Sequence, residues 1–212
     1  SVAGATIALE KSTATLTYPR QVKVCRFADV SSIVGYNDIT DDGSAVLKAL
    51  PLRDTFVLYR ETGIFIGRYS AQMEQPFPFK RAFRGKNINV PYYPDTLIDV
   101  EGLGHLFAGR KPDGEEDSGG HFFLFDGVDE PRRIMSLDVS SETFFKSVTD
   151  QASAFACHQP NTGEIWFCSP TMVLAYDVTT KTCSEIDAAV TAAALVKNPA
   201  GSDKRFVLAT GG

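Results

Sequence analysis

The hydrophobic positions of this chain fall in short runs that polar turn residues separate. The clearest pair is formed by residues 56–59 and 64–66, which are mostly β-branched or aromatic, with Arg60-Glu61-Thr62-Gly63 between them. This pattern predicts a β-hairpin. Gly63 stands where a tight turn needs a residue that tolerates positive φ, so we expect it to supply that conformation.

Similar runs along the rest of the chain predict a mostly β protein. Polar turns rich in Gly, Pro, Asn and Asp separate them. Strands are expected at residues 5–9, 13–18, 22–27, 96–100, 103–108, 121–126, 152–157, 164–168, 172–176, 181–186, 190–197 and 205–209.

One segment, residues 138–147, carries a helical pattern. Asp138 or Ser140 is expected to cap its N-terminus, and Phe144, Phe145 and Val148 fall on one side of it. We expect a short helix inserted between β-units.

Two of the β-units end alike. Leu124-Phe125-Asp126 and Ala175-Tyr176-Asp177 each place an aromatic-Asp pair at the end of a strand, 51 residues apart. Repeats of four short strands every ~40–50 residues are typical of β-propellers. The sequence therefore predicts an all-β fold, a β-propeller-like array of four-stranded antiparallel blades with four to five blades, as a single domain over residues 1–212. Either the N-terminal strands within 5–18 close the last blade, or the chain is a fragment of a longer propeller.

Composition and charge narrow the function classes. The hydrophobic fraction of 43% with 22% charged residues is typical of a soluble globular protein, and no apolar run approaches the ~20 residues of a membrane helix. We therefore expect no membrane span. A net charge of −5 is unsuited to coating nucleic acid, so any contact with DNA is expected to be local. The chain starts at Ser1 without a visible leader, which favours a processed product or a piece of a longer chain.

The basic segment 80–86 is the candidate for such a local contact. Lys80, Arg81, Arg84 and Lys86 surround Phe83, and clustered cations bind phosphates or an acidic partner. They are our candidate interface or DNA-facing residues. The simpler interpretation, a solvated loop between β-units, is the favoured one. The acidic run 113–117 is the natural candidate for a contact of opposite charge.

No motif predicts catalysis or a metal centre, so we expect no catalytic, metal-binding or cofactor-binding residues. Residues 38–43 resemble the first half of a calcium loop, but its twelfth position is Ala49 rather than an acid, which favours a plain acidic turn. The three histidines share no ligand spacing. The four cysteines lack a C-x-x-C pair and are interpreted as buried, reduced thiols.

The order of motifs resembles a known family. L-R-D-T-F-V-L-Y-R-E-T-G-I-F-I-G-R-Y, P-F-P-F-K-R-A-F-R-G, F-F-L-F-D-G, N-T-G-E-I-W-F-C and V-L-A-Y-D-V-T-T-K-T are similar to the propeller region of tail proteins of tailed bacteriophages, in particular the nozzle or tail-tube-tip proteins of short-tailed phages. Cys183 stands where that family usually has tryptophan.

The resemblance implies a non-enzymatic structural protein of the virion, made in the host cytoplasm. It implies a ring of copies in the tail, around the DNA exit path, with other tail or portal proteins as partners and transient contact with phage DNA. Two alternatives stay open. One is a carbohydrate-binding or kelch-like propeller, although Trp166 sits mid-strand where core packing accounts for it. The other is a propeller glycosidase or lyase, which needs two carboxylates in a cleft.

Overall fold

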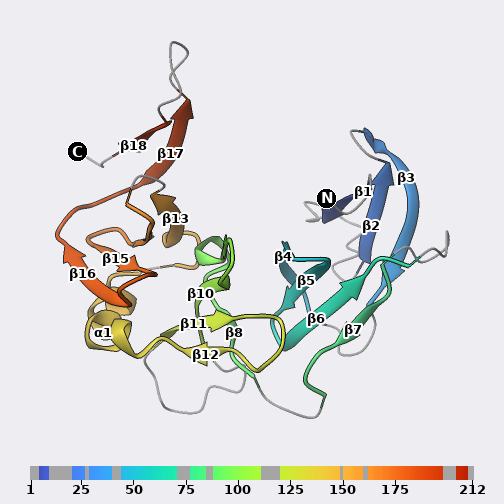
Figure 1. Cartoon of the computed structure of the whole chain (residues 1–212), viewed down its shortest axis with the longest axis horizontal. Coiled ribbons are helices and arrows are strands. Elements are labelled where there is room, and N and C mark those ends of the chain that lie inside the picture. The colour runs from blue at the N-terminus through green and yellow to red at the C-terminus, as the bar shows by residue number, and fades with distance from the viewer. Residues whose placement is uncertain are drawn as a thin grey trace. The chain divides into compact units, whose positions relative to one another are not determined.

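The structure is a computed structural model, and it is mostly β, with antiparallel sheets and one short helix, as predicted (Figure 1). Contacts within the chain divide it into two compact units, Ser1–Val90 with Lys111–Asp113 and Pro91–Arg110 with Gly114–Gly212, and each is described by itself. The structure describes residues 5–9, 21–26, 29–39, 44–70, 77–84, 88–110, 120–148, 150–159, 162–197 and 204–209.

The first sheet has three strands in the order β1-β2-β3: β1 (Ala5–Leu9), β2 (Gln21–Arg26) and β3 (Asp29–Asp38). The sequence predicted β1 and β2 but not β3, because its stretch D-V-S-S-I-V-G-Y-N-D alternates poorly. The predicted strand 13–18 lies outside the described residues.

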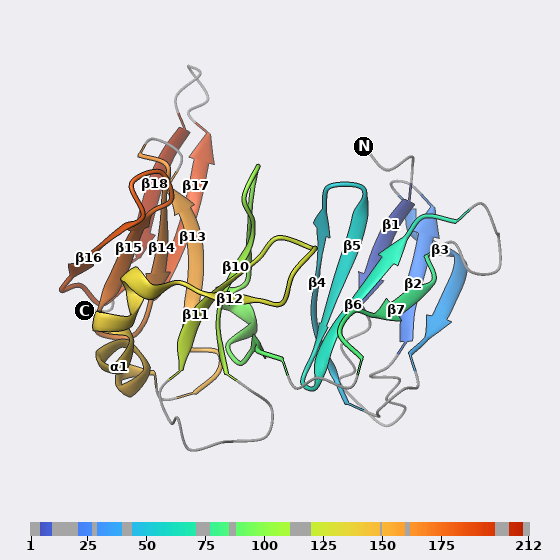
Figure 2. The same ribbon diagram turned by 60° about the horizontal axis from the view of Figure 1, so that its bottom comes forward.

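The second sheet is a meander in chain order, β4-β5-β6-β7 (Figure 2). The central hairpin is confirmed, since β5 pairs with β6 across a turn at Glu61 and Thr62. The expectation of positive φ at Gly63 is wrong: Gly63 is the first residue of β6 and pairs with Arg60. Positive φ occurs instead in the preceding turn, at Arg53 (φ 55). The strands are β4 (Val46–Leu52), β5 (Thr55–Arg60), β6 (Gly63–Arg68) and β7 (Phe79–Arg81).

The third sheet has the order β12-β11-β10-β8, with β9 also paired to β10. Its β9–β10 hairpin turns at Gly102, which has φ 77, in the gap between the predicted strands 96–100 and 103–108. Its elements are β8 (Val90–Pro91), η1 (Pro94–Thr96), β9 (Ile98–Val100), β10 (Gly104–Arg110), β11 (His121–Phe125) and β12 (Arg132–Arg133).

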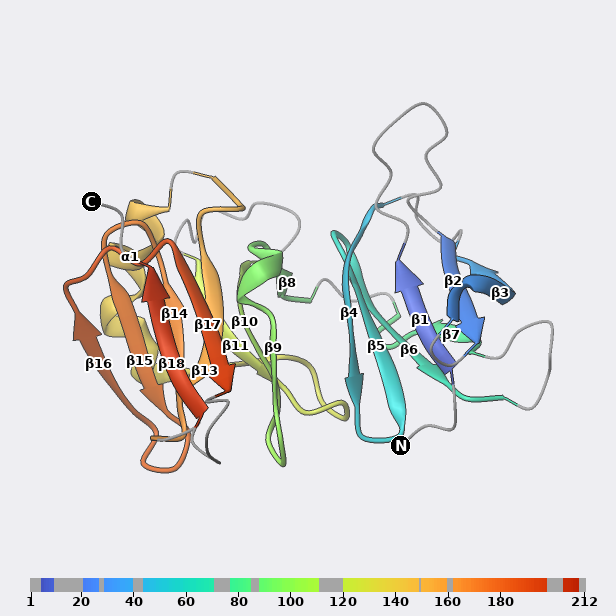
Figure 3. The same ribbon diagram turned by 90° about the horizontal axis from the view of Figure 1, so that it is seen from above.

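The fourth sheet is a four-stranded meander, β13-β14-β15-β16, with its strands at the predicted positions. Strands β17 and β18 form a fifth sheet of two strands (Figure 3). None of these sheets, in the part of the chain that the structure describes, closes into a barrel. The strands are β13 (Phe155–Gln159), β14 (Glu164–Cys168), β15 (Val173–Asp177), β16 (Thr182–Ile186), β17 (Ala192–Lys197) and β18 (Lys204–Ala209).

The aromatic-Asp repeat has one local structure at both sites. The Oδ1 atom of Asp126 accepts hydrogen bonds from the backbone N–H groups of Val128 (3.0 Å) and Asp129 (3.2 Å). Oδ1 of Asp177 accepts them from Thr179 (2.7 Å) and Thr180 (3.1 Å). Each aspartate thus closes an Asx-type turn directly after a strand.

The helix α1 (Asp138–Ser147) has the predicted bounds and contacts β11 and β15. Neither Asp138 nor Ser140 caps it, because the 3₁₀ helix η2 (Met135–Leu137) runs directly into it and Leu137 occupies the N-cap position in a helical conformation. Among described helices none has the length and apolar character that a membrane crossing requires.

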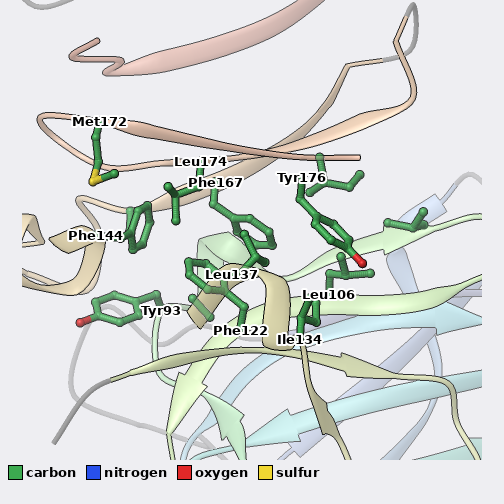
Figure 4. Packing of buried hydrophobic residues seen from close by; sticks show 14 residues of the cluster. Tyr93, Leu106, Phe122, Ile134, Leu137, Phe144, Phe167, Met172, Leu174 and Tyr176 are labelled. Carbon is green, nitrogen blue, oxygen red and sulfur yellow. The ribbon is translucent and has the colours of Figure 1, made fainter. Parts of the chain in front are cut away.

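The main core of the second unit lies between α1 and the third and fourth sheets. Phe122 is at its centre: its ring centroid lies 4.5 Å from that of Phe167, 5.2 Å from Phe144 and 5.3 Å from Phe145 (Figure 4). Phe144 and Phe122 are fully buried, so the aromatic side of the helix packs as its sequence pattern predicted.

Candidate interaction surface on the second sheet

The strand β7 places the basic segment at one edge of the second sheet. Phe79 pairs with Gly67, Lys80 with Ile66 and Arg81 with Phe65. Because side chains alternate along a strand, Arg81 and Phe79 share one face while Lys80 points to the other. Lys80 and Arg84 are exposed, whereas Lys86 lies outside the described residues.

Arg81 is held against the hairpin. Its Nη2 donates a 2.7 Å hydrogen bond to the carbonyl oxygen of Thr62, and its Cζ lies 6.0 Å from the ring centroid of Phe65. A Cβ atom on Gly63 would lie 3.2 Å from both Nε and Nη2 of Arg81. The glycine therefore leaves room for the close approach of this guanidinium and does not supply a positive φ.

The same face of β6 receives a second side chain from β7. A Cβ atom on Gly67 would lie 2.7 Å from the Phe79 ring, so that ring packs directly on the backbone of β6. Gly63 and Gly67 together let β7 dock with two large side chains lying flat over its neighbour.

Arg60, on the same face, is a fully buried arginine that sequence reasoning assigned only to the turn. Its Nε donates to the carbonyl oxygen of Ser44 (3.1 Å) and its Nη1 to that of Ile39 (3.2 Å); Nη2 also donates to Ser44. Its Cζ lies 5.2 Å from the ring centroid of Phe65. A buried charge requires such partners, and an arginine at the end of a strand gives no sequence signal that it will be buried.

Two guanidinium groups, those of Arg60 and Arg81, thus lie against the ring of Phe65. Both serve the packing of the sheet, through cation–π contact and carbonyl hydrogen bonds. Of the four predicted cations, Lys80 and Arg84 are the ones that the structure describes as exposed. These two can attract phosphate groups or an acidic protein surface.

The histidines belong to the second unit. His105 is fully buried, and its Nε2 lies 3.7 Å from Oδ1 of its cross-strand partner Asp99. Nδ1 of His121 lies 3.4 Å from Oδ1 of Asp138, which also accepts a 2.7 Å hydrogen bond from Nε of Arg133. Within the described ranges no three His, Cys, Asp or Glu side chains are grouped so that they could hold a metal ion. The calcium-like residues 40–43 and the acidic run 113–117 lie outside the described residues.

Trp166 and three of the four cysteines lie in the fourth sheet, while Cys25 lies in β2 of the first sheet. Trp166 lies mid-strand, as its sequence position indicated, but it is only half-buried, and its Nε1 donates a 3.0 Å hydrogen bond to Oε2 of Glu164. Cys157, Cys168 and Cys183 are free; the interpretation as buried thiols holds fully for Cys168, while the other two are half-buried.

Comparison with known proteins assigns the chain to no group: no family model matches it, and no curated protein matches its sequence.

Proposed function

We propose that the chain is a non-enzymatic structural protein of a bacteriophage virion, a tail nozzle or hub component that assembles in a ring around the DNA exit path. The supporting observation is architectural. Successive antiparallel sheets are built from short strands of neighbouring chain segments, and two of them end their next-to-last strand in the same Asp turn. Propeller blades are also built from short consecutive antiparallel strands, so this observation supports the propeller that the resemblance to tail nozzle proteins implies.

In this role the sheets act as a rigid scaffold that presents loops to neighbouring subunits. The partners are further copies of the chain, other tail or portal proteins, and phage DNA during its exit. Lys80, exposed on the edge strand β7, and Arg84, exposed in the turn that follows it, provide a positive surface for an acidic neighbour or for phosphates. The completed virion is the proposed location, after synthesis in the host cytoplasm.

Electron microscopy of the native particle tests the proposal most directly. A ring of several copies located on a phage tail supports it. A free monomer with a closed propeller and an acidic pocket on its axis overturns it, because that arrangement is typical of an enzyme or a ligand-binding protein.

Charge reversal tests the surface separately. The double variant Lys80→Glu/Arg84→Glu should lose assembly with other tail components, whereas Lys181→Glu, in the exposed turn before β16, should assemble normally. Arg81 is left unchanged because it holds the hairpin through Thr62. Unchanged assembly of the double variant removes this edge from the interface.

A carbohydrate-binding function is the second candidate, because Trp166 is partly exposed beside the Glu164 carboxylate. An indole face next to a hydrogen-bond acceptor is suited to a sugar ring. Saturable binding on a glycan array that Trp166→Ala abolishes would favour this candidate, and an empty array would exclude it.

A further inference from the structure

Two cysteine thiols meet on one face of the fourth sheet. The register pairs Cys157 with Trp166 and Phe155 with Cys168. Because directly paired residues share a face and alternate residues return to it, the two cysteines are diagonal neighbours on that face. Both side chains belong to one apolar cluster on that face, where Cys157 packs against buried Cys168 and Val173, and the Cys157 thiol donates to the carbonyl oxygen of Trp166 at 3.8 Å.

The two sulfur atoms have different surroundings. Cys168 is fully buried with Val173 and Val190, while Cys157 packs against the edge of this cluster and stays partly exposed. A hydrogen bond with the neighbouring Cys168 lowers the pKa of Cys157 although burial opposes this. The same interaction and burial raise the pKa of Cys168. A thiolate at the accessible sulfur is the nucleophile of thiol chemistry, and the second thiol lies diagonally across the same strand pair.

We propose that Cys157 and Cys168 form a redox-active dithiol, which hydroperoxides oxidise to a reversible disulfide between β13 and β14. The Cys157 thiolate attacks one peroxide oxygen and the O–O bond breaks, which gives a sulfenic acid and, with one proton, water. The Cys168 sulfur then attacks the Cys157 sulfur, and the departing hydroxide takes the Cys168 proton as a second water. The two thiols lose two electrons and two protons, and hydrogen peroxide is reduced to two waters.

Sheet geometry indicates why the disulfide is reversible. Diagonal residues on an antiparallel pair have Cα atoms roughly 7–8 Å apart, and disulfides prefer a separation of up to about 6.8 Å. Within its sheet β13 is an edge strand, paired to β14 alone, so it can shift to close the gap. A bond that needs such a shift is strained, and strained disulfides are readily reduced.

The test uses the reduced chain treated with hydrogen peroxide, followed by intact mass and peptide mapping. Cleavage after Glu164 separates the two cysteines, which otherwise lie on one tryptic peptide. The expected result is a loss of two hydrogen masses, a Cys157–Cys168 cross-linked peptide, and full reversal by dithiothreitol. Cys157 should also react with iodoacetamide at neutral pH at least about 10-fold faster than Cys183.

Cys183 is the matched control because it lies on the opposite face of the sheet, paired with Tyr176, where burial, with Glu185 adding to it, raises its pKa to about 11. Cys183→Ser should oxidise like the wild type. Cys168→Ser should accumulate the Cys157 sulfenic acid, trapped by dimedone, without a disulfide. Circular dichroism verifies that each variant is folded. Oxidation of Cys157 beyond sulfenic acid in the wild type, a disulfide only between molecules, or no reaction at Cys157 each overturns the proposal.

Discussion

Asp126 and Asp177 lie 51 residues apart in the chain and hold the same turn in two different sheets. Each stands at the end of the next-to-last strand of its sheet in chain order, β11 or β15, and each accepts hydrogen bonds from the backbone N–H groups two and three residues later. The faint aromatic-Asp repeat in the sequence therefore reflects a repeated physical requirement. The first peptide groups after the strand leave the β-ladder, and a carboxylate replaces the missing acceptor.

Removing the Asp126 carboxylate should weaken the fold slightly. Asp126→Ala leaves two N–H groups without their acceptor and removes the 3.0 Å ion pair with Arg132, so we expect a loss of about 1 kcal/mol in unfolding free energy. Asp126→Asn keeps an acceptor oxygen and should lose less. Urea unfolding measures both, and equal stability of Asp126→Ala and the wild type would contradict the prediction.

The carboxylates of Asp126 and Asp177 should make the stability of the fold depend on pH. Burial opposes ionisation of Asp126, but the N–H groups of Val128 and Asp129 and the Arg132 guanidinium outweigh it, so its pKa is lowered. The N–H groups of Thr180 and Thr179 lower the pKa of Asp177. A lowered folded-state pKa gives stability that is present above the ordinary value of about 3.9 and is lost as pH falls through the folded value.

Thermal unfolding of the wild type and Asp126→Asn at neutral pH and near pH 2 measures this effect. The difference in Tm between the two proteins should shrink as the pH falls, because protonation of the wild-type carboxyl then increases. A difference that stays constant across this range would show that the charge of Asp126 does not stabilise the turn.

Two glycines of the β9–β10 hairpin are expected to be required for different reasons: one because a Cβ atom would clash, the other because of its backbone conformation. Gly104 has φ 128, and a Cβ atom there would overlap the carbonyl oxygen of Phe125 and lie 3.1 Å from Cα of Asp126. Gly102 has φ 77 with nothing within 4 Å of a Cβ position. Gly104→Ala should therefore cost about 3 kcal/mol or more, and Gly102→Ala only about 1 kcal/mol. Chemical denaturation compares them, and equal losses would mean that the contact with Phe125 relaxes freely.

Glycines also show what the sequence could and could not predict. The position of the β5–β6 hairpin followed from two β-branched and aromatic runs, and its strands were correct. The physical reason for a glycine at position 63 was not predicted, because Arg81, whose side chain lies against it, comes 18 residues later in the chain. Local sequence patterns show where a glycine lies, but the side chain that occupies the space beside Gly63 belongs to another strand.

The basic segment illustrates the same limit at the candidate surface. Its four cations are equivalent in the sequence, yet β7 turns Arg81 onto Phe65 and Thr62 while Lys80 faces the other side. The strand β3 was missed because its polar and glycine residues hide the period-two pattern. The helix α1 and the meander β13 to β16 were predicted because periodicity and turn residues agree there.

Arg60 should be essential for the stability of the second sheet. Arg60→Met keeps an apolar stem but removes the donors to the carbonyl groups of Ile39 and Ser44, so we expect a loss of about 3 kcal/mol. Arg68→Met, at an exposed position at the end of β6, should change stability by less than about 0.5 kcal/mol. Guanidinium chloride unfolding measures both variants, and a neutral effect of Arg60→Met would show that these carbonyl groups find water instead.

Phe122 should matter most for the core of the second unit. Its ring contacts those of Phe144, Phe145 and Phe167 and so joins β11 to the helix and to β14. Because three stiff aromatic neighbours cannot collapse into the space, Phe122→Ala should leave a cavity and cost about 4 kcal/mol. Met135→Ala, whose side chain is 70% exposed on η2, is the control and should change stability by less than about 0.5 kcal/mol. Phe122→Leu should recover part of the stability lost in Phe122→Ala, as measured by calorimetry. If Phe122→Ala lost no more stability than Met135→Ala, the Phe122 ring would not hold the two sheets and the helix together.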